Sequence, residues 1–374
     1  MIPVCEPTLI GNELKYVTDC IQTNWIGSTG KYIELFENAF ANFCDVQYGV
    51  GCSNGTTALH LALESLGIGN GDEVIIPDFT MIATGNAVIY TGAKPVFVDS
   101  ELETWNIDPK KIEDKITKKT KAIIVVHTYG HPVDMDPLTE IAKRYNLFVI
   151  EDAAEAHGAE YKGRKVGSLG DVACFSFYSN KVLTTGEGGM VVTNNKEFAE
   201  KAKLLRSHAL TVPRFLHQEL GFNYRITNIH SAIGLAQTEK ADELVNMRIK
   251  NANIYSQLLK NIPGVTLPPQ KEWAKNVYWM YGILINKDFG MDAKSLREEL
   301  LKKGIDTRAF FVGMHSQPLY KNFKGENKPD CSGQFPNSEF LEKCGFYLPS
   351  SNSLTREQIE TIVKEIKLIQ EKAK

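Results

Sequence analysis

Apolar runs and amphipathic stretches alternate along the first half of the chain. Four runs have the apolar character of buried strands: 73–77, 95–98, 122–126 and 148–150. Three stretches carry apolar residues at helical spacing: 57–66, 82–90 and 136–145. Because strands and helices alternate, we predict an α/β fold with a mainly parallel sheet covered by helices on both faces. Ligands of such sheets bind beyond the C-terminal strand ends, so residues that follow each strand are candidates for function.

The pattern changes after residue 226. A helical stretch spans 226–259 and is followed by Pro263-Gly264, a strong helix breaker. The rest of the chain carries further candidates: strands over 277–285 and 307–312, helices over 293–302 and 355–372. A chain of 374 residues is also long for a single simple core. We therefore predict two domains: a large α/β domain with an N-terminal helical segment over residues 1–240, and a smaller α+β domain over residues 241–374.

Composition and charge narrow the class of protein. Hydrophobic residues make up 43% and charged residues 23%, with a net charge of −3 and no basic face, so nucleic acid and anionic membranes are not expected partners. The seven cysteines are scattered and include no CxxC pair, which argues against a disulfide framework and against a zinc site. We read neither a signal peptide nor a membrane span. These features favour a soluble protein of the reducing cytoplasm that holds no metal.

A phosphate site is suggested where a strand candidate over 48–52 gives way to a helix. The segment Ser53-Asn54-Gly55-Thr56-Thr57 places small and hydroxylated residues at the start of that helix. A helix N-terminus presents free N–H groups and the positive end of a dipole, which suit an anion. An ordinary Ser/Thr helix cap would have the same appearance. The GxxxxGK[ST] pattern of nucleotide-triphosphate loops is absent, so this is not a P-loop.

Two ionisable residues follow later strands. Asp152 ends the strand candidate at 148–150 and could pair with a cationic ring nitrogen, although an acidic helix cap is an equal alternative. Lys181 follows the apolar run 174–177 and precedes a Gly-rich turn, where an amine can be desolvated and become nucleophilic toward carbonyls. By itself this segment favours the alternative, a surface lysine on a loop. Together, a phosphate cradle, a carboxylate and a lysine on one sheet suit pyridoxal phosphate, whose aldehyde condenses with a lysine.

The chain resembles the sugar-nucleotide aminotransferases of the DegT/DnrJ/EryC1/StrS type, within the fold-type I superfamily. Four segments carry the resemblance: 53–59 (SNGTTAL), 151–158 (EDAAEAHG), 175–181 (FSFYSNK) and 184–194 (TTGEGGMVVTN). The match runs from residue 3 to about residue 365. It implies a large domain with a mainly parallel seven-stranded sheet between helices, and a smaller C-terminal α+β domain.

The resemblance also implies roles for particular residues. Lys181 matches the lysine that bonds the cofactor and moves protons, Asp152 the partner of the pyridine nitrogen, and Glu155 a side chain near the ring hydroxyl. The remaining matches are Gly55, Thr56 and Ser176 as phosphate ligands, Ala154 beneath the ring, and Asn223, which reaches the cofactor phosphate of a neighbouring subunit. That last role implies a homodimer with shared active sites. Met81 departs from the pattern, because the family commonly has an aromatic residue there that stacks on the ring.

Candidates for substrate binding are less specific. Trp25 and Ser28 lie in a Gly/Ser loop between two helices, which could wrap a nucleotide sugar or simply connect. Arg225 could hold a carboxylate or phosphate, or could serve the subunit interface. His315 resembles a segment that approaches the sugar, and Glu187 lies between two glycines as either a substrate contact or a turn carboxylate. We expect His127 and His157 to be structural.

The activity implied by the resemblance is amino-group transfer in two half-reactions. L-Glutamate is the expected donor, and the acceptor is C4 of a nucleotide-linked 4-keto-6-deoxy sugar. The narrower match of 24–30, 125–132 and 221–225 favours GDP-4-keto-6-deoxy-D-mannose, giving GDP-perosamine for O-antigen or a related glycan. UDP- and dTDP-linked sugars and 3-keto sugars are alternatives. Sugar dehydratases of this fold carry histidine in place of the lysine, so Lys181 argues against that activity, and a non-catalytic regulatory protein would have lost part of the site.

Overall fold

The structure, a computed structural model, describes residues 1–213 and 215–373. Its centre is a seven-stranded sheet in which β9 alone runs antiparallel to its neighbours, as predicted for a mainly parallel sheet. The strands, in spatial order, are β1 Tyr48–Cys52, β9 Gly189–Thr193, β8 Val172–Ser176, β5 Phe148–Asp152, β4 Thr120–Val126, β2 Glu73–Pro77 and β3 Lys94–Val98. Each strand predicted over 73–150 is present, with bounds that differ by at most two residues.

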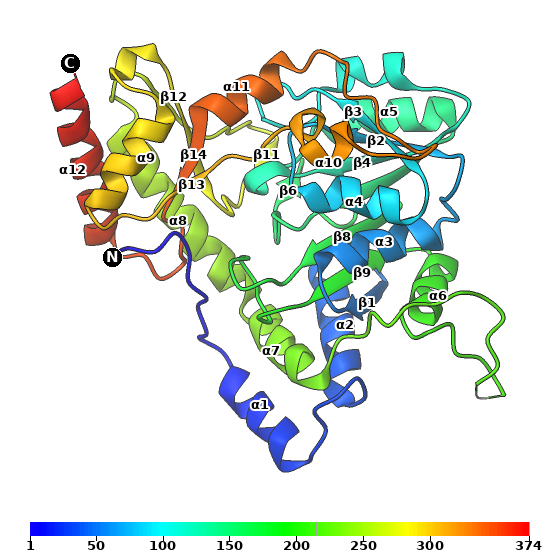
Figure 1. Cartoon of the computed structure of the whole chain (residues 1–374). Helices are drawn as coiled ribbons and strands as arrows, with labels where there is room; N and C mark the ends of the chain where they lie inside the picture. Colours follow the sequence, from blue (N-terminus) through cyan, green and yellow to red (C-terminus); the bar gives the residue numbers. More distant parts are fainter. Residues whose placement is uncertain (214, 374) are drawn as a thin grey trace.

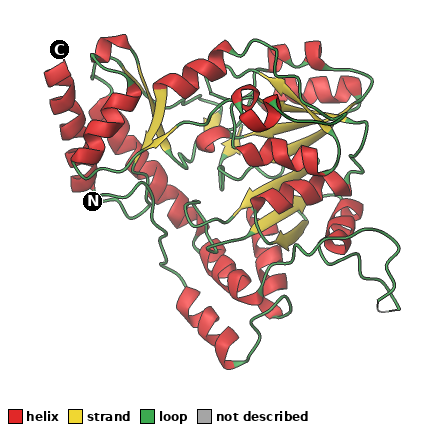
Figure 2. Cartoon of the chain, in the orientation of Figure 1, coloured by secondary structure: helices red, strands yellow, loops and turns green. Residues whose placement is uncertain are grey.

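Helices cover both faces of this sheet (Figures 1 and 2). Neighbouring strand residues enter opposite cores: Ile76 packs in one core with Leu59 of α3, while Ile75 packs in the other with Leu138 of α5. One set of helices comprises α3 Gly55–Ser65, α4 Ile82–Tyr90 and α6 Lys196–Leu205, and the other includes α2 Lys31–Phe43 and α5 Met135–Tyr145. Both faces are buried, which explains why the strands are apolar without alternation.

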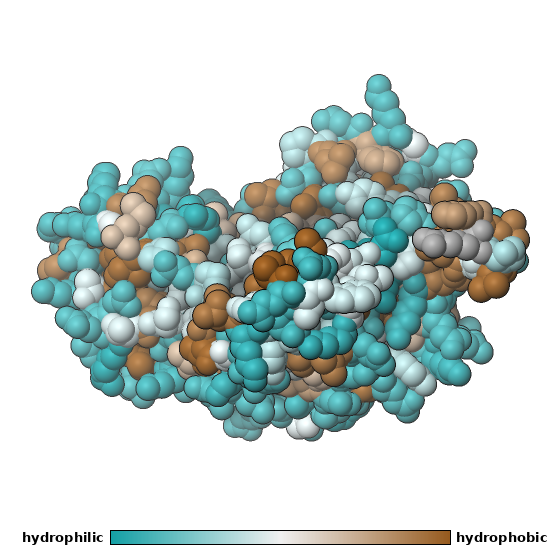
Figure 3. Space-filling view, turned by 90° about the horizontal axis from the view of Figure 1, so that it is seen from below, coloured by the Kyte–Doolittle hydropathy of each residue, from teal (hydrophilic) through white to brown (hydrophobic). Residues whose placement is uncertain are grey.

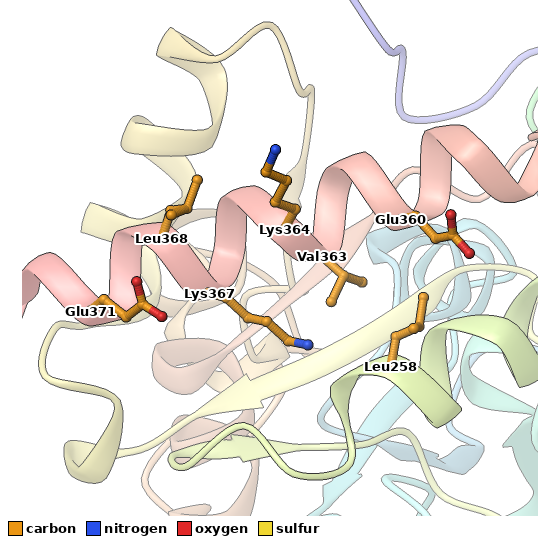
Figure 4. A pocket seen from close by; sticks show the side chains of 7 residues that line it. All are labelled: Leu258, Glu360, Val363, Lys364, Lys367, Leu368 and Glu371. Carbon is orange, nitrogen blue, oxygen red and sulfur yellow. The ribbon is translucent and has the colours of Figure 1, made fainter.

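A second, antiparallel sheet forms with the C-terminal third of the chain. Its order is β10 Val265–Thr266, β12 Tyr281–Ile285, β14 Gly345–Leu348 and β13 Arg308–Ala309. Three helices pack on it: α8 Ala241–Leu259, α9 Ala293–Lys302 and α12 Arg356–Ala373. Between α8 and α12, Leu258 and Val363 line a shallow groove that Lys367 also borders (Figure 4). This groove shares no residue with the cavity described below.

Some predicted boundaries were wrong for local reasons. The helical stretch 226–259 is two helices, α7 Asn228–Glu239 and α8, because Lys240 between them has φ −112° and ψ 11°. The strand predicted over 277–285 begins only at Tyr281, since Tyr278 takes a left-handed conformation with φ 48°. The strand predicted over 307–312 is reduced to β13.

Other elements connect distant parts of the chain. A small sheet joins β6 Glu160–Tyr161 and β7 Arg164–Lys165 to β11 Ala274–Lys275, and Ile2 donates a backbone hydrogen bond to Gly304 at 2.7 Å. The remaining helices are α1 Glu13–Gln22, α10 Pro318–Lys321 and α11 Pro336–Cys344, with 3-10 turns at Pro109–Lys111, Glu113–Lys115, Thr128–Gly130, Lys287–Phe289 and Met314–Ser316. No helix in the described part of the chain is long and apolar enough to cross a membrane.

Candidate active site

A cavity of about 640 Å³ opens where the strands of the large sheet end. Strand-end residues line it, namely Val126 of β4, Asp152 of β5 and Ser176 of β8. The cavity therefore lies beyond the C-terminal strand ends, where the sequence predicts a ligand site. The cavity also brings together nine of the predicted site residues: Gly55, Thr56, Met81, Asp152, Ala154, Glu155, Ser176, Lys181 and Glu187.

The N-terminus of α3 forms one end of the cavity. A capping box starts this helix, with Thr57 N donating to Asn54 Oδ1 at 2.9 Å and Asn54 N donating to Thr57 Oγ1 at 3.1 Å. The next two backbone N–H groups, of Gly55 and Thr56, lie in the first turn of the helix. They have no helical carbonyl oxygen four residues earlier to accept their hydrogen bonds. A Cβ on Gly55 would lie 2.7 Å from Cβ of Ser176, so glycine lets the two approach. Two amides, a hydroxyl and a helix dipole make a cradle for a phosphate.

Asp152 lies deep in the cavity with few donors. It is 5% exposed, and Thr84 Oγ1 donates to its Oδ2 at 2.8 Å while Ala154 N donates to its Oδ1 at 3.3 Å. Burial raises the pKa of the Asp152 carboxyl, and these two hydrogen bonds oppose that rise. A buried carboxylate with only neutral donors is suited to a cationic partner, as a protonated ring nitrogen would be.

Glu155 is a second buried carboxyl on the cavity wall. The backbone N–H of Tyr129 donates to Glu155 Oε2 at 2.7 Å, and Tyr129 is held with φ 52° in the left-handed region. Burial raises the pKa of Glu155 to about 7, while the charge of Lys181 acts in the opposite direction. A carboxyl with a pKa near neutrality can hold or release a proton at physiological pH. The irregular segment 127–131 thus places a donor where a regular strand would have none.

Lys181 lies in the turn after β8. Burial lowers the pKa of its amine, and the charges of Glu155 and Asp152 partly offset that effect. Its Nζ lies 3.7 Å from the centroid of the Trp279 ring. The residue is therefore no surface lysine but a half-buried amine directed at the cavity. Trp279 belongs to the segment before β12, and no feature of the sequence beyond the aromatic-rich segment 278–281 points to it.

Apolar and aromatic side chains complete the wall of the cavity. Met81 is 48% exposed and caps α4, with Ala83 N donating to its Sδ at 3.0 Å. Ala154 lines the cavity as predicted, whereas Phe79 points away and packs with Phe310 and Phe311 in the core. A thioether can contact an aromatic ring, so Met81 is able to replace the expected aromatic side chain. Sequence reasoning gave no site role to four further aromatic residues that line the cavity: Tyr90, Tyr178, Phe311 and Tyr347.

Three predicted substrate residues lie outside this cavity. Trp25 borders a separate hollow with Asp19, Lys31 and Asn228, between α1 and α2, and Ser28 lies in the same loop. His315 is 7% exposed, and its Nδ1 lies 2.8 Å from Asp78 Oδ2. The hydrogen bond with Asp78 raises the pKa of His315. For Trp25, Ser28 and His315 a role in substrate binding stays a prediction.

Asn223 and Arg225 also lie outside the cavity of their own chain. Arg225 Nη2 donates to Asn223 Oδ1 at 2.6 Å, and Asn223 is exposed. Asn223 closes a hairpin with Ser207, and Arg225 follows that hairpin. The hairpin projects from the body of the molecule in Figure 1. Asn223 is not among the residues that line the cavity of its own chain, and its role toward the phosphate of a neighbouring subunit stays a prediction.

The histidines at the strand ends have structural surroundings. His127 accepts a hydrogen bond on Nδ1 from Val133 N at 3.1 Å, so its Nε2 carries the proton that faces Glu151 Oε2 at 3.0 Å. His157 lies among Phe40, Phe175 and Phe177. Neither histidine lines the cavity. The expectation that both are structural agrees with this placement.

The cavity fits pyridoxal phosphate on the chemistry of its residues. The α3 cradle would hold the phosphate, Asp152 the ring nitrogen, Ala154 and Met81 the ring faces, and Lys181 the aldehyde carbon. When bound, the cofactor withdraws electrons from the carbon that gains or loses the amino group. The Asp152 carboxylate favours the protonated ring nitrogen, which strengthens that withdrawal. Lys181 Nζ would carry protons, and Glu155, whose pKa burial raises to about 7, could share one with a neighbouring oxygen.

Comparison with known proteins agrees with this site. Residues 7–367 match the DegT/DnrJ/EryC1/StrS aminotransferase family. A GDP-perosamine synthase of Escherichia coli O157:H7 is 46% identical over 366 residues, which cover 98% of the chain and 97% of the relative, and one of Caulobacter vibrioides is 44% identical over 367 residues, covering 97% and 96%. The crystal structure of an aminotransferase from Psychrobacter cryohalolentis superposes with a TM-score of 0.91 at 30% identity, over 98% of both chains. The chain belongs to the DegT/DnrJ/EryC1/StrS aminotransferase family and is a pyridoxal-phosphate-dependent aminotransferase.

Proposed function

We propose that this enzyme transfers the amino group of L-glutamate to C4 of GDP-4-keto-6-deoxy-D-mannose, giving GDP-perosamine. The observation that carries the proposal is the similarity to two GDP-perosamine synthases over nearly the full length of the chain. The residues of the cavity supply what the transfer needs, with Lys181 as the lysine that bonds the cofactor. The product is a building block for O-antigen or a related surface glycan, and we place the reaction in the cytoplasm.

The substrate test offers GDP-, UDP- and dTDP-linked 4-keto-6-deoxy sugars with glutamate to the purified enzyme. We expect kcat/KM to be at least about tenfold higher for the GDP-linked sugar, since one well-placed polar contact to the base is worth that much. The position of the new amine, read by NMR of the product, should be C4. A preference for a UDP- or dTDP-linked sugar, or amination at C3, would replace the proposed substrate and leave the aminotransferase chemistry untouched.

We further propose that the enzyme works as a homodimer with shared active sites. Asn223 is exposed and lies outside its own cavity, at the base of the projecting hairpin. That hairpin exposes apolar side chains, with Val212 93% and Leu220 83% exposed, and Figure 3 shows apolar surface at this end of the molecule. Exposed apolar residues on a projecting arm favour contact with a second copy. In the dimer, Asn223 and Arg225 would complete the phosphate site and the substrate site of the partner.

The turn between α7 and α8 is our proposed boundary between two domains. We propose that residues 1–240 and 241–374 act as two domains, with the cavity between them. Residues from both parts line the cavity: Lys181 and Asp152 from the first, Trp279 and Tyr347 from the second. Such an arrangement lets the smaller domain contribute walls to a site whose reactive groups lie on the larger one.

A further inference from the structure

The contact between Lys181 and Trp279 is unusual for a reactive amine. Nζ lies 3.7 Å from the centroid of the indole ring, and Trp279 is 4% exposed. Glu155 and Asp152 act on the amine through their charges rather than through a hydrogen bond. The close neighbour of Nζ is therefore an aromatic face, which attracts a cation and cannot accept its proton.

The indole is fixed on two sides. Its Nε1–H donates to the carbonyl oxygen of Asn180 at 2.8 Å, and Arg248 Nη1 donates to the carbonyl oxygen of Trp279 at 2.9 Å. Arg248 is itself 2% exposed in α8, so it anchors the tryptophan backbone to the core. Because Asn180 directly precedes Lys181, the hydrogen bond ties the ring to the same turn that carries the lysine. The ring and the amine are thus positioned against each other.

Transamination frees this lysine once in every cycle. On the proposed role of Lys181, its Nζ leaves the cofactor when the amino donor binds and returns after the amino group has been passed on. A free ammonium in a buried cavity needs a partner, because an unpaired buried charge is costly. An ion pair with Glu155 would neutralise the charge of the ammonium, but the Glu155 carboxylate could also take its proton.

We propose that the indole face of Trp279 holds the Lys181 ammonium that forms each time the freed amine takes up a proton during transfer of the amino group. The ring stabilises the charged amine without removing its proton, so the proton stays on Nζ until the substrate presents an acceptor. Trp279 is then a residue that acts on the reacting nitrogen, contributed by the C-terminal part of the chain.

The test measures the ionisation of Lys181 directly. Holoenzyme loaded with pyridoxamine phosphate, which leaves Lys181 free, is treated with cyanate, because cyanate reacts only with the unprotonated amine. Carbamylation of the peptide that contains Lys181 is followed by mass spectrometry from about pH 6 to about pH 10. The midpoint of the rate against pH gives the pKa of Nζ, while the plateau at high pH reports access to the amine.

We expect Trp279→Leu to move the midpoint down by about 0.7 pH unit, so that the rate below the midpoint rises about fivefold, since a cation–π contact of this kind is lost. Trp279→Phe, which keeps a weaker aromatic face, should give an intermediate midpoint and guards against a folding defect in the leucine variant. Trp273→Leu is the matched control, because Trp273 packs on His131 and Tyr161 in a separate core and should leave the midpoint unchanged.

An unchanged or raised midpoint in both Trp279 variants would overturn the proposal, even if the plateau changed, because the ring would then be only a steric wall. The result is separable from the role of Lys181 itself. If borohydride fixes the cofactor to a residue other than Lys181, the proposed anchor fails, whereas the cyanate midpoints still report whether the indole stabilises this amine.

Discussion

At the scale of single residues, environment decides chemistry more than residue type does. The same amine that would be inert on the surface has its pKa lowered here by burial, while the Glu155 carboxyl has its pKa raised to about 7 by the same cause. Lys181 and Asp152 were identifiable from the sequence because each lies at or just after the end of a buried strand, whereas Glu155 was identified only through the family resemblance. Trp279 was not identifiable, because its closeness to Lys181 depends on how the segment 277–280 packs on Gly130 through a 3.1 Å backbone hydrogen bond.

The buried imidazole of His157 should lower the free energy of unfolding in acid. Burial lowers its pKa to about 3, from an ordinary value of 6.5, so the unfolded chain takes up the proton first as the pH falls below about 6.5. The histidine therefore lowers the free energy of unfolding by about 2 kcal/mol at pH 5 relative to neutral pH. We expect His157→Leu to remove that part of the pH dependence, measured by urea denaturation at both pH values.

A substitution of the exposed His217 to Gln serves as the control and should leave the pH dependence as it is. If His157→Leu and the natural protein lose the same free energy of unfolding between the two pH values, His157 is not the group that makes the fold acid-sensitive.

At the scale of elements, the sequence predicted the parallel strands and their helices well because both have clear periodicity. It failed where a few residues leave regular geometry, at Lys240 and Tyr278, since such breaks follow from tertiary packing rather than from local preference. The start of α3 was predictable as an anion site from its small residues. The structure adds why Gly55 is required there, namely the approach of Ser176.

Gly55→Ala should weaken cofactor binding. The new Cβ would lie 2.7 Å from Cβ of Ser176 and would push apart two sides of the phosphate cradle. Overpacking of this kind costs about 1–3 kcal/mol, so we expect the Kd of pyridoxal phosphate to rise about tenfold or more. Titration of the cofactor, followed by its absorbance, measures the effect.

Gly69→Ala provides a matched control, since its Cβ would meet Thr91 O at an ordinary 3.6 Å. It should bind the cofactor as the natural protein does. A folded Gly55→Ala protein with an unchanged Kd would show that the α3 N-terminus does not hold the phosphate.

At the scale of the whole molecule, the cavity is incomplete within one chain if Asn223 acts as proposed. Lys181→Ala removes the reactive amine, and Asn223→Asp sets a carboxylate against a phosphate. Each variant alone should be nearly inactive. The two variants are then refolded together as an equal mixture. If the active sites are shared, the mixture should have about one quarter of the natural activity, because half the dimers are mixed and each mixed dimer contains one intact site.

Sites built from a single chain would regain nothing on mixing, because no chain in the mixture carries both natural residues. Light scattering of each variant verifies that dimers form before the comparison is made.

The central claim is that Lys181 bonds the cofactor, and one measurement addresses it directly. Purified holoenzyme is reduced with borohydride and digested, and the peptides are mapped by mass spectrometry. The account predicts that the mass of the reduced cofactor is attached to Lys181, and that pretreatment with glutamate, which frees the lysine, prevents the attachment. Attachment to any other lysine, or a Lys181→Ala protein that still aminates the keto sugar, would contradict it.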